Sequence, residues 1–364
     1  MPSTHSDTIT VSIALSDLPP SRRGFSTPLL LVPLAANGLG GGAVRSVTFS
    51  SIDEAQTART ASEISAETLA RVTTLFAQRD SFGRTPDRII VGNADLAASP
   101  TPETYADAYD VMRNLGLDFY AVYLESRTAA DILGLAAQVE AVGEHLLGVV
   151  LSDVEVLTAG LPAGLTALGA YERTVAYFHD VATAHIEVGH MAKRLMFNPD
   201  EISASWRGQV DGVAGLATAL TQTQKDAARA NNVNLPLPFG DVEVFIDPGY
   251  NARGRPIYEI VTADWLRARV REDIAAEVNA HEQRGAKIVL DATGIATIQA
   301  IVEGRLEQGE RVGHFVTGQT TVSASSIDVA TEKISITGSG QRATAARLFD
   351  FNFQISADPV VVGA

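Results

Sequence analysis

The chain has 364 residues, of which 46% are hydrophobic and 20% are charged, the composition of a globular protein long enough for two domains. Its net charge of −15 disfavours nucleic acids and anionic membrane surfaces as partners, because both are bound through basic faces. There is no cysteine, which excludes disulfides, thiolate catalysis and thiolate metal sites. The sequence shows no signal-peptide pattern and no apolar run long enough to cross a bilayer, so we expect a soluble protein.

The first element in chain order is an amphipathic strand over residues 8–16. Its apolar residues alternate with small, mostly polar ones, and a period of two places these four on one face: Ile9, Val11, Ile13 and Leu15. Pro19 and Pro20 end this strand, because proline cannot donate a hydrogen bond to a ladder.

The middle of the chain alternates between short apolar runs and amphipathic helices. The predicted strands cover residues 27–32, 44–49, 88–92, 118–124, 145–151 and 174–179. The predicted helices cover residues 51–60, 66–77, 101–115, 128–142 and 182–196. This alternation indicates an α/β layer with mostly parallel strands.

The composition changes at residues 231–238, which are rich in asparagine and proline. Beyond them we expect a hairpin of residues 239–246 and 256–261, joined by an Asp-Pro-Gly turn. A helix over residues 264–282 follows, with Asp264 as its predicted N-cap. The remaining predicted elements are a helix over residues 296–306 and strands over residues 314–322 and 327–336.

A second amphipathic strand lies near the C-terminus, over residues 347–356. Its apolar face consists of Phe349, Phe351, Phe353 and Ile355. Two interpretations of both terminal strands stay open: each is an edge strand of its own sheet, or each completes the sheet of a neighbouring subunit. The β-rich ends also suggest one domain built from both termini, with the α/β domain inserted into it.

No sequence pattern indicates a reaction, a cofactor or a metal. His185 and His190 are five residues apart, about 140° around a helix, whereas the zinc-protease motif needs a spacing of four with the glutamate directly after the first histidine. Glu187 is displaced from that position, so we expect polar residues on a helix face. The glycine-rich loop 38–42 leads into a strand rather than into a helix N-terminus that would bind phosphate.

No G-x-S-x-G elbow marks a nucleophile, so we expect no catalytic residue. Carboxylates such as Glu155, Asp247 and Asp264 are interpreted as turn, cap and surface groups. An α/β-fold enzyme of unidentified reaction stays the main alternative to a structural protein, because fold class alone does not decide function.

Residues 239–270, which contain the hairpin, its Pro-Gly turn and an Asp-Trp-Leu helix, resemble the core of contractile phage tail sheath proteins. The opening residues 9–25, with Pro-Pro-Ser-Arg-Arg-Gly-Phe, and the runs at 120–124 and 176–179 resemble the same family. The matching positions of the core motif are Gly240, Pro248, Gly249, Asp264, Trp265 and Leu266.

The resemblance implies a sheath of stacked hexameric rings around a tail tube, which contracts to drive the tube through a host envelope. Its implied organisation is an N-terminal arm and the start of an inner domain in residues 1–25, an outer α/β domain in 26–231, and the rest of the inner domain with a C-terminal arm in 232–364. The implied partners are copies of the chain itself, the tube protein, and baseplate and tail terminator proteins. The implied location is a virion tail assembled in the host cytoplasm, and another filament-forming tail or surface protein is the second alternative.

Two further predictions concern motion and contact. The resemblance implies flexible links to the arms, for which the candidate hinge residues are Pro19, Pro20, Gly338 and Gly340. A basic cluster on the helix over 264–282 is either a contact for an acidic partner such as the tube or a solvated helix face, and it consists of Arg267, Arg269 and Arg271.

Overall fold

The largest feature of the structure is a six-stranded sheet in the order β3-β4-β2-β5-β6-β7. The computed structural model describes residues 8–9, 24–80, 82–98, 100–289, 291–328 and 333–343. The sheet is parallel except for its edge strand β3, which runs antiparallel to β4. The strand bounds are Pro28–Pro33 (β2), Ser46–Phe49 (β3), Ile89–Ala94 (β4), Ala121–Leu124 (β5), Leu146–Leu151 (β6) and Thr174–Phe178 (β7). This confirms the predicted α/β layer.

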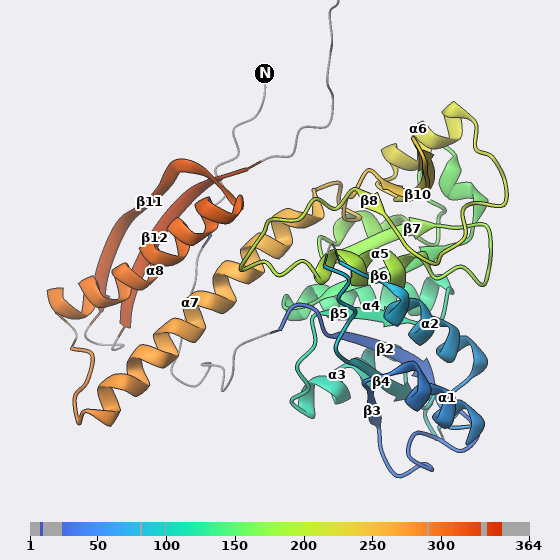
Figure 1. Cartoon of the computed structure of the whole chain (residues 1–364), viewed down its shortest axis with the longest axis horizontal. Helices are drawn as coiled ribbons and strands as arrows, with labels where there is room; N and C mark the ends of the chain where they lie inside the picture. The colour runs from blue at the N-terminus through green and yellow to red at the C-terminus, as the bar shows by residue number, and fades with distance from the viewer. Residues whose placement is uncertain are drawn as a thin grey trace, which may run out of the picture.

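Helices cover both faces of this sheet (Figure 1). One face carries α1 (Ile52–Thr60), α2 (Ala66–Ala77) and α5 (Ile186–Leu195), and the other carries α3 (Tyr105–Asn114) and α4 (Ala129–Val142). Two short 3-10 helices, η2 (Val154–Leu157) and η3 (Thr166–Ala170), lie between β6 and β7. Because both faces are covered, the strands are apolar on both sides, which is why their sequences are continuous apolar runs.

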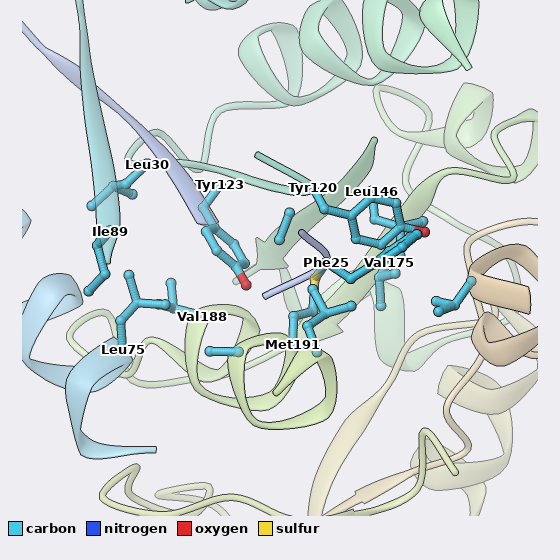
Figure 2. Close-up of a cluster of buried hydrophobic side chains, with 14 of the residues drawn as sticks. Phe25, Leu30, Leu75, Ile89, Tyr120, Tyr123, Leu146, Val175, Val188 and Met191 are labelled. Atoms are coloured by element: carbon cyan, nitrogen blue, oxygen red, sulfur yellow. The ribbon is translucent and has the colours of Figure 1, made fainter. Parts of the chain in front are cut away.

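Side chains from the sheet and the helices interlock on the first of these faces. Figure 2 shows Tyr123 pointing from the sheet toward the helices, where Leu75 of α2 and Val188 and Met191 of α5 surround it. Hydroxyl side chains cap the starts of α1, α2, α3 and α4. Thr104 and Asp107 form a capping box, so α3 begins at Tyr105 rather than at residue 101.

The segment after α5 forms a small second sheet in the order β8-β10-β9, next to α6 (Gln222–Ala230). Its strands are β8 (Gly208–Gln209), β9 (Leu235–Phe239) and β10 (Val242–Asp247). Asn234 fastens it to the main sheet, since its amide donates to the Ala176 and Tyr250 carbonyls at 2.9 and 2.8 Å and accepts from the Gly249 and Tyr250 N–H groups at 2.8 and 3.1 Å. The predicted domain boundary at residues 231 and 232 therefore falls inside a connected part of the fold.

A 27-residue helix, α7 (Ile257–Gln283), leaves this part of the molecule and is about 40 Å long. The predicted strand over residues 256–261 is wrong, because these residues form the first turns of α7. Their β-branched run suggested a strand, but Ile257, Ile260 and Val261 follow helical spacing and are buried together against the sheet's helices. The predicted N-cap at Asp264 is also wrong, since that residue lies inside α7.

The rest of the described chain folds against α7 (Figure 1). It comprises α8 (Ala292–Val312), β11 (Phe315–Asp328), β12 (Lys333–Arg342) and the two residues of β1 (Thr8–Ile9). We call these four elements the hairpin unit and the described residues 24–256 the α/β block; α7 joins the two. In the described residues, no helix has the length and apolar composition needed to cross a membrane.

Candidate assembly site

Both ends of the chain enter one sheet in the hairpin unit. β11 and β12 pair antiparallel, with Val322 beside Gly338 and Ile327 beside Ile334. β12 then pairs on its other side with β1 of the same chain, with Ile9 beside Gly338. The order is therefore β1-β12-β11, a sheet formed by residues 8–9, 333–342 and 315–328.

This sheet has long edges without a strand partner in the part of the chain that the structure describes. β11 is 14 residues long and forms one edge, while β1 covers β12 over only two residues. An edge strand presents backbone N–H and C=O groups that can pair with a strand from another chain. The β11 edge and most of the β12 edge therefore have no strand partner among the described residues.

Many apolar side chains of α8 and of the far half of α7 are only half-buried. From α8 to β12, the described apolar side chains that are fully buried are Leu306 and Phe315. The half-buried ones in the far half of α7 and in α8 include Ile274, Val278, Ile295, Ile298, Ile301 and Val302. Among the described residues, this part of the fold therefore keeps apolar surface partly exposed, which is a feature of contact surfaces.

Gly338 and Gly340, the predicted hinge glycines, lie inside β12 rather than in a link between elements. A Cβ at Gly340 would lie 3.0 Å from the Phe315 ring, and one at Gly338 would lie 3.3 Å from the Thr321 carbonyl oxygen. Both glycines therefore allow close packing within the hairpin unit, which corrects the prediction that they form a loose link. The other two hinge candidates, Pro19 and Pro20, lie outside the described residues.

Asp200, in the loop after α5, joins the α/β block to α7. Its carboxylate accepts hydrogen bonds from Trp265 Nε1 at 2.9 Å and from Arg269 Nε and Nη2 at 2.8 and 2.9 Å. Its backbone carbonyl accepts from Gln308 of α8 at 3.1 Å. Trp265 is fully buried and stacks on His314, with ring centroids 4.6 Å apart. We call this cluster the Asp200 junction.

His314 extends the Asp200 junction to the start of β11. Its Nε2 lies 2.8 Å from the Pro199 carbonyl oxygen, and its Nδ1 lies 2.9 Å from the Thr262 hydroxyl. Burial lowers the pKa of His314, which favours the neutral ring. A neutral ring with its proton on Nε2 donates to Pro199 and accepts from Thr262, so both contacts are satisfied.

A second connection joins α7 to the main sheet. Asp264 forms a bidentate ion pair with Arg173, at 2.8 and 2.7 Å, and accepts a hydrogen bond from the Tyr120 hydroxyl at 2.8 Å. Asp264 and Arg173 are both largely buried. Their two parallel hydrogen bonds are directional, so the pair fixes the position of α7 on the main sheet. α7 is therefore attached on two sides of its first half.

The other positions of the family motif also have structural roles. Gly240 has φ +57° at the turn between β9 and β10, and Gly249 has φ +76° directly after the cis peptide bond that precedes Pro248. A Cβ at Gly249 would lie 2.4 Å from the Trp206 carbonyl oxygen, so only glycine fits there. Leu266, a residue of α7, is buried in the hydrophobic core.

The predicted basic cluster does not form a shared exposed face. Arg269 is buried, with 3% of its surface exposed, and pairs with Asp200 and Glu272. It is therefore unavailable to a partner, which corrects the prediction. Arg267 donates to the Gly143 carbonyl and Arg271 lies 3.9 Å from Glu144, so both point toward the α/β block, and contact with a tube stays a prediction for these two.

Most of the two terminal arms lies outside the described residues. The residues concerned are Val11, Ile13, Leu15, Phe349, Phe351, Phe353 and Ile355. Ile9 is described and lies in its own chain's sheet, as the edge-strand interpretation expects. Donation of either arm to a neighbouring subunit stays a prediction.

Glu187 and His190, two of the residues considered for metal binding, have partners within the fold, whereas neither ring nitrogen of His185 has a hydrogen-bond partner among the described residues. Glu187 pairs with Arg71 of α2, and the His190 ring is bonded to the Tyr177 hydroxyl at 2.7 Å. His185 is buried at the start of α5, and this burial lowers its pKa to about 3. The described residues contain no group of three or more side chains placed to hold a metal ion.

The glycine-rich loop is occupied by a carboxylate of its own chain. The N–H groups of Gly40 and Gly41 donate to the two Glu63 carboxylate oxygens at 3.2 and 3.1 Å. The remaining carboxylates have equally local surroundings, since Asp247 pairs with Arg207 and Arg229.

Sequence reasoning missed Asp200, Asn234 and Arg173, which hold the parts of the fold together. Asp200 lies in an Asn-Pro-Asp turn and Asn234 lies in the stretch interpreted as a boundary, so the local signals indicated loops. Their partners lie up to 108 residues away along the chain, as for Asp200 and Gln308, while Arg173 and Asp264 are 91 residues apart.

Among known proteins, similarity to this chain is found at the level of structure. No protein-family model matches the chain, and no curated protein matches its sequence. A chain of the anti-feeding prophage (AFP) baseplate is 11% identical with a TM-score of 0.64, over 95% of this chain and 97% of that chain. A chain of the AFP helical sheath in its contracted state is 11% identical with a TM-score of 0.63, over 98% of this chain and 100% of that chain.

The chain has the fold of a contractile sheath protein. The similarity extends over both the α/β block and the hairpin unit, because it covers nearly the whole of each chain. The resemblance noticed in residues 239–270 therefore pointed to the right fold.

Proposed function

We propose that this chain is a structural subunit of a contractile sheath. In this proposal, copies of the chain form stacked six-subunit rings around a tube, and the sheath shortens and widens to drive the tube through an envelope. The similarity in fold to the contracted AFP sheath, over 98% of this chain, carries the proposal. The tube, baseplate and terminator proteins and a place in a tail-like particle assembled in the host cytoplasm belong to the same proposal.

The hairpin unit supplies the means of self-assembly. Its open β11 edge can accept a strand, and its half-buried apolar side chains can be covered by a neighbour. The terminal arms would supply those strands, since their alternating pattern suits an added edge strand with four apolar side chains on one face. Each copy would then be held by more than one neighbour, which makes a weak single contact strong in an array.

Contraction would change the contacts between copies rather than the fold of each copy. The Asp200 junction and the Arg173–Asp264 pair attach α7 to the α/β block through several charge-assisted hydrogen bonds. Subunits fixed in this way rotate as rigid bodies between two sets of lateral contacts. The protein therefore acts as a mechanical part and not as an enzyme.

A second candidate is a role at the baseplate end of the same kind of particle. The AFP baseplate chain matches with a TM-score of 0.64, as well as the sheath chain does. A subunit restricted to that end would form a single ring rather than a tube.

Electron microscopy of the concentrated, purified chain distinguishes these possibilities. A sheath subunit is expected to form tubes or stacked rings, a baseplate ring component single rings, and an enzyme small closed oligomers. Discrete monomers or dimers at all concentrations would contradict the proposal.

Truncation then tests the arms. Removing residues 1–18, or separately residues 348–364, should leave a folded chain that no longer polymerises, with circular dichroism and thermal melting as the measure of folding. Tubes formed by either truncated chain would contradict strand donation by the arm removed, and an unfolded product would favour the edge-strand interpretation.

A further inference from the structure

The edge strand β11 of the hairpin unit is irregular near its start. Between the paired residues Phe315–Arg342 and Thr320–Gly340, β11 contains four residues and β12 contains one. These four residues, 316–319, form a bulge and are mostly exposed. Bulges in strands end or redirect the pairing of the strand that contains them.

Glu310, in the last turn of α8, holds this bulge. One of its carboxylate oxygens accepts from the Gly318 N–H at 2.9 Å, and the other accepts from the Thr320 N–H at 3.2 Å and from the Thr320 hydroxyl. The Gly318 N–H and the Thr320 hydroxyl lower the pKa of Glu310, because they stabilise its charged form. We call this arrangement the Glu310 clamp.

The bulge has a defined shape because the chain is also fixed just before it. Phe315 is buried, with 2% of its surface exposed, and lies directly on the backbone of α8 and β12. A Cβ at Gly309 would lie 2.6 Å from the Phe315 ring, and one at Gly340 would lie 3.0 Å from it. Within the bulge, Gly318 has φ +71°, a conformation that favours glycine.

The Glu310 clamp closes the first part of the β11 edge. Because the Gly318 and Thr320 N–H groups donate to the carboxylate, they are not available to a strand added at this edge. The part of β11 beyond the clamp is residues 321–328. An added strand therefore has fewer possible registers than a regular edge of 14 residues would allow. The register matters because a slip of one residue turns the apolar face of the added strand to the opposite side.

The two edges of the hairpin sheet differ in what is left to cover them. β1, from the N-terminal end of the chain, already lies beside β12. The β11 edge is therefore the place left for the C-terminal amphipathic strand predicted over residues 347–356. That strand alternates strictly between apolar and polar residues, so its register decides which side chains reach the core.

We propose that the Glu310 clamp fixes the register in which the C-terminal strand of a second copy pairs with β11. This inference rests on the proposed function and adds a residue that decides the geometry of the contact. Glu310 is a positioning residue, since it acts through the backbone of β11. A helical lattice repeats one contact between all neighbouring copies, so a single register is needed throughout.

The first measurement tests the clamp in single copies of the full-length chain. Glu310→Ala should speed amide hydrogen exchange of residues 316–322 by about tenfold or more, the effect of losing hydrogen bonds to a charged group. Glu310→Gln keeps the shape of the side chain with one acceptor oxygen in place of two, and should give a smaller increase; it replaces Glu310→Ala if thermal melting shows that variant to be unfolded. Unchanged exchange in these variants would refute the clamp.

The second measurement tests the register in the assembled polymer. The chain has no cysteine, so Thr321→Cys can be paired with one cysteine placed in residues 347–356 of the other copy. Electron cryo-microscopy of the unaltered polymer identifies the residue opposite Thr321, and a second pair uses the residue two positions further along. The yield of the first disulfide relative to the second should fall by about tenfold or more in Glu310→Ala, because the carboxylate no longer opposes pairing at Gly318 and Thr320.

Glu307→Ala is the matched control. Glu307 is an exposed residue of the same helix, and its carboxylate has no hydrogen bond among the described residues, so the ratio of yields should equal that of the unaltered chain. An unchanged ratio in Glu310→Ala, or a polymer in which no strand pairs with β11, would refute the proposed role of Glu310 while the sheath function stands. If the unaltered chain forms no polymer, the proposed function itself fails.

Discussion

The α/β block and the hairpin unit both contain many apolar side chains, but the described residues bury these side chains to different degrees. In the block, the six-stranded sheet lies between two layers of helices, and two clusters of fully buried apolar residues fill both faces. In the hairpin unit, a three-stranded sheet packs against α8, and most described apolar side chains of α8 stay half-buried. Among the described residues, the block therefore has a filled core, whereas α8 keeps apolar surface that the described strands do not cover.

In the proposed sheath, part of the free energy of assembly would come from the half-buried apolar side chains of α8. Apolar surface that a second chain covers contributes roughly 25 cal/mol per Å². The net charge of −15 would keep single copies apart until such contacts form. The comparison leads to three experiments on single residues.

The largest effect is expected from breaking the buried ion pair between Arg71 and Glu187 in the α/β block. Both side chains are almost completely buried, so Arg71→Met leaves the Glu187 carboxylate without its partner. The free energy of unfolding should fall by about 3–5 kcal/mol. Urea or guanidinium denaturation measures this change.

Two control variants test whether the loss of stability comes from the unpaired buried charge. Arg71→Met combined with Glu187→Met should recover much of the loss, because no charge is left buried. Arg253→Ala removes the exposed pair with Glu172 and should cost less than about 1 kcal/mol. An equal loss in the single and double variants would contradict an electrostatic origin.

The second experiment replaces one large apolar side chain by alanine in each of the two regions. Leu147→Ala in β6 of the main sheet should lower the free energy of unfolding by about 2–5 kcal/mol, because the side chain is fully buried. Ile298→Ala in α8 should cost the single chain about 1 kcal/mol, because Ile298 is only half-buried.

For assembly we expect the opposite order, with a larger effect from Ile298→Ala than from Leu147→Ala. Ile298→Ala should raise the critical concentration for polymer formation, measured by sedimentation, since its remaining surface would be covered there. A normal critical concentration for Ile298→Ala would indicate that this face of α8 is not an interface.

The third experiment concerns pH. Burial, followed by the nearby charges of Arg71 and Arg127, lowers the pKa of His185 from 6.5 to about 3. The unfolded chain therefore binds a proton between these values that the folded chain does not bind, so stability falls as the pH drops below 6.5 and levels off near 3. The loss reaches about 2 kcal/mol at pH 5, at about 1.4 kcal/mol per pH unit.

His185→Gln should reduce this dependence by one proton, as measured by denaturation at pH 7 and pH 5. Some dependence should remain, because burial also lowers the pKa values of His190 and His314. An unchanged slope in His185→Gln would show that His185 takes no part in the loss of stability at low pH.

The sequence by itself determined the parts of this protein whose signals are local. The alternation of apolar runs and amphipathic helices predicted the main sheet, because strands buried on both faces must be apolar throughout. The residues around 239–270 were enough to suggest the fold, and the period of two at the N-terminus marked a strand that includes Ile9.

Only the tertiary structure decided how these parts are joined. Residues 256–261 suit a strand or a helix equally by composition, and their burial against the α/β block selects the first turns of α7. Asp264 was expected at a helix start and Arg269 on an exposed face, yet their charges are held by Arg173 and Asp200, which are 91 and 69 residues away. Periodicity reports what a residue's neighbours in sequence require, whereas a buried charge is stabilised by whichever distant group the fold brings to it.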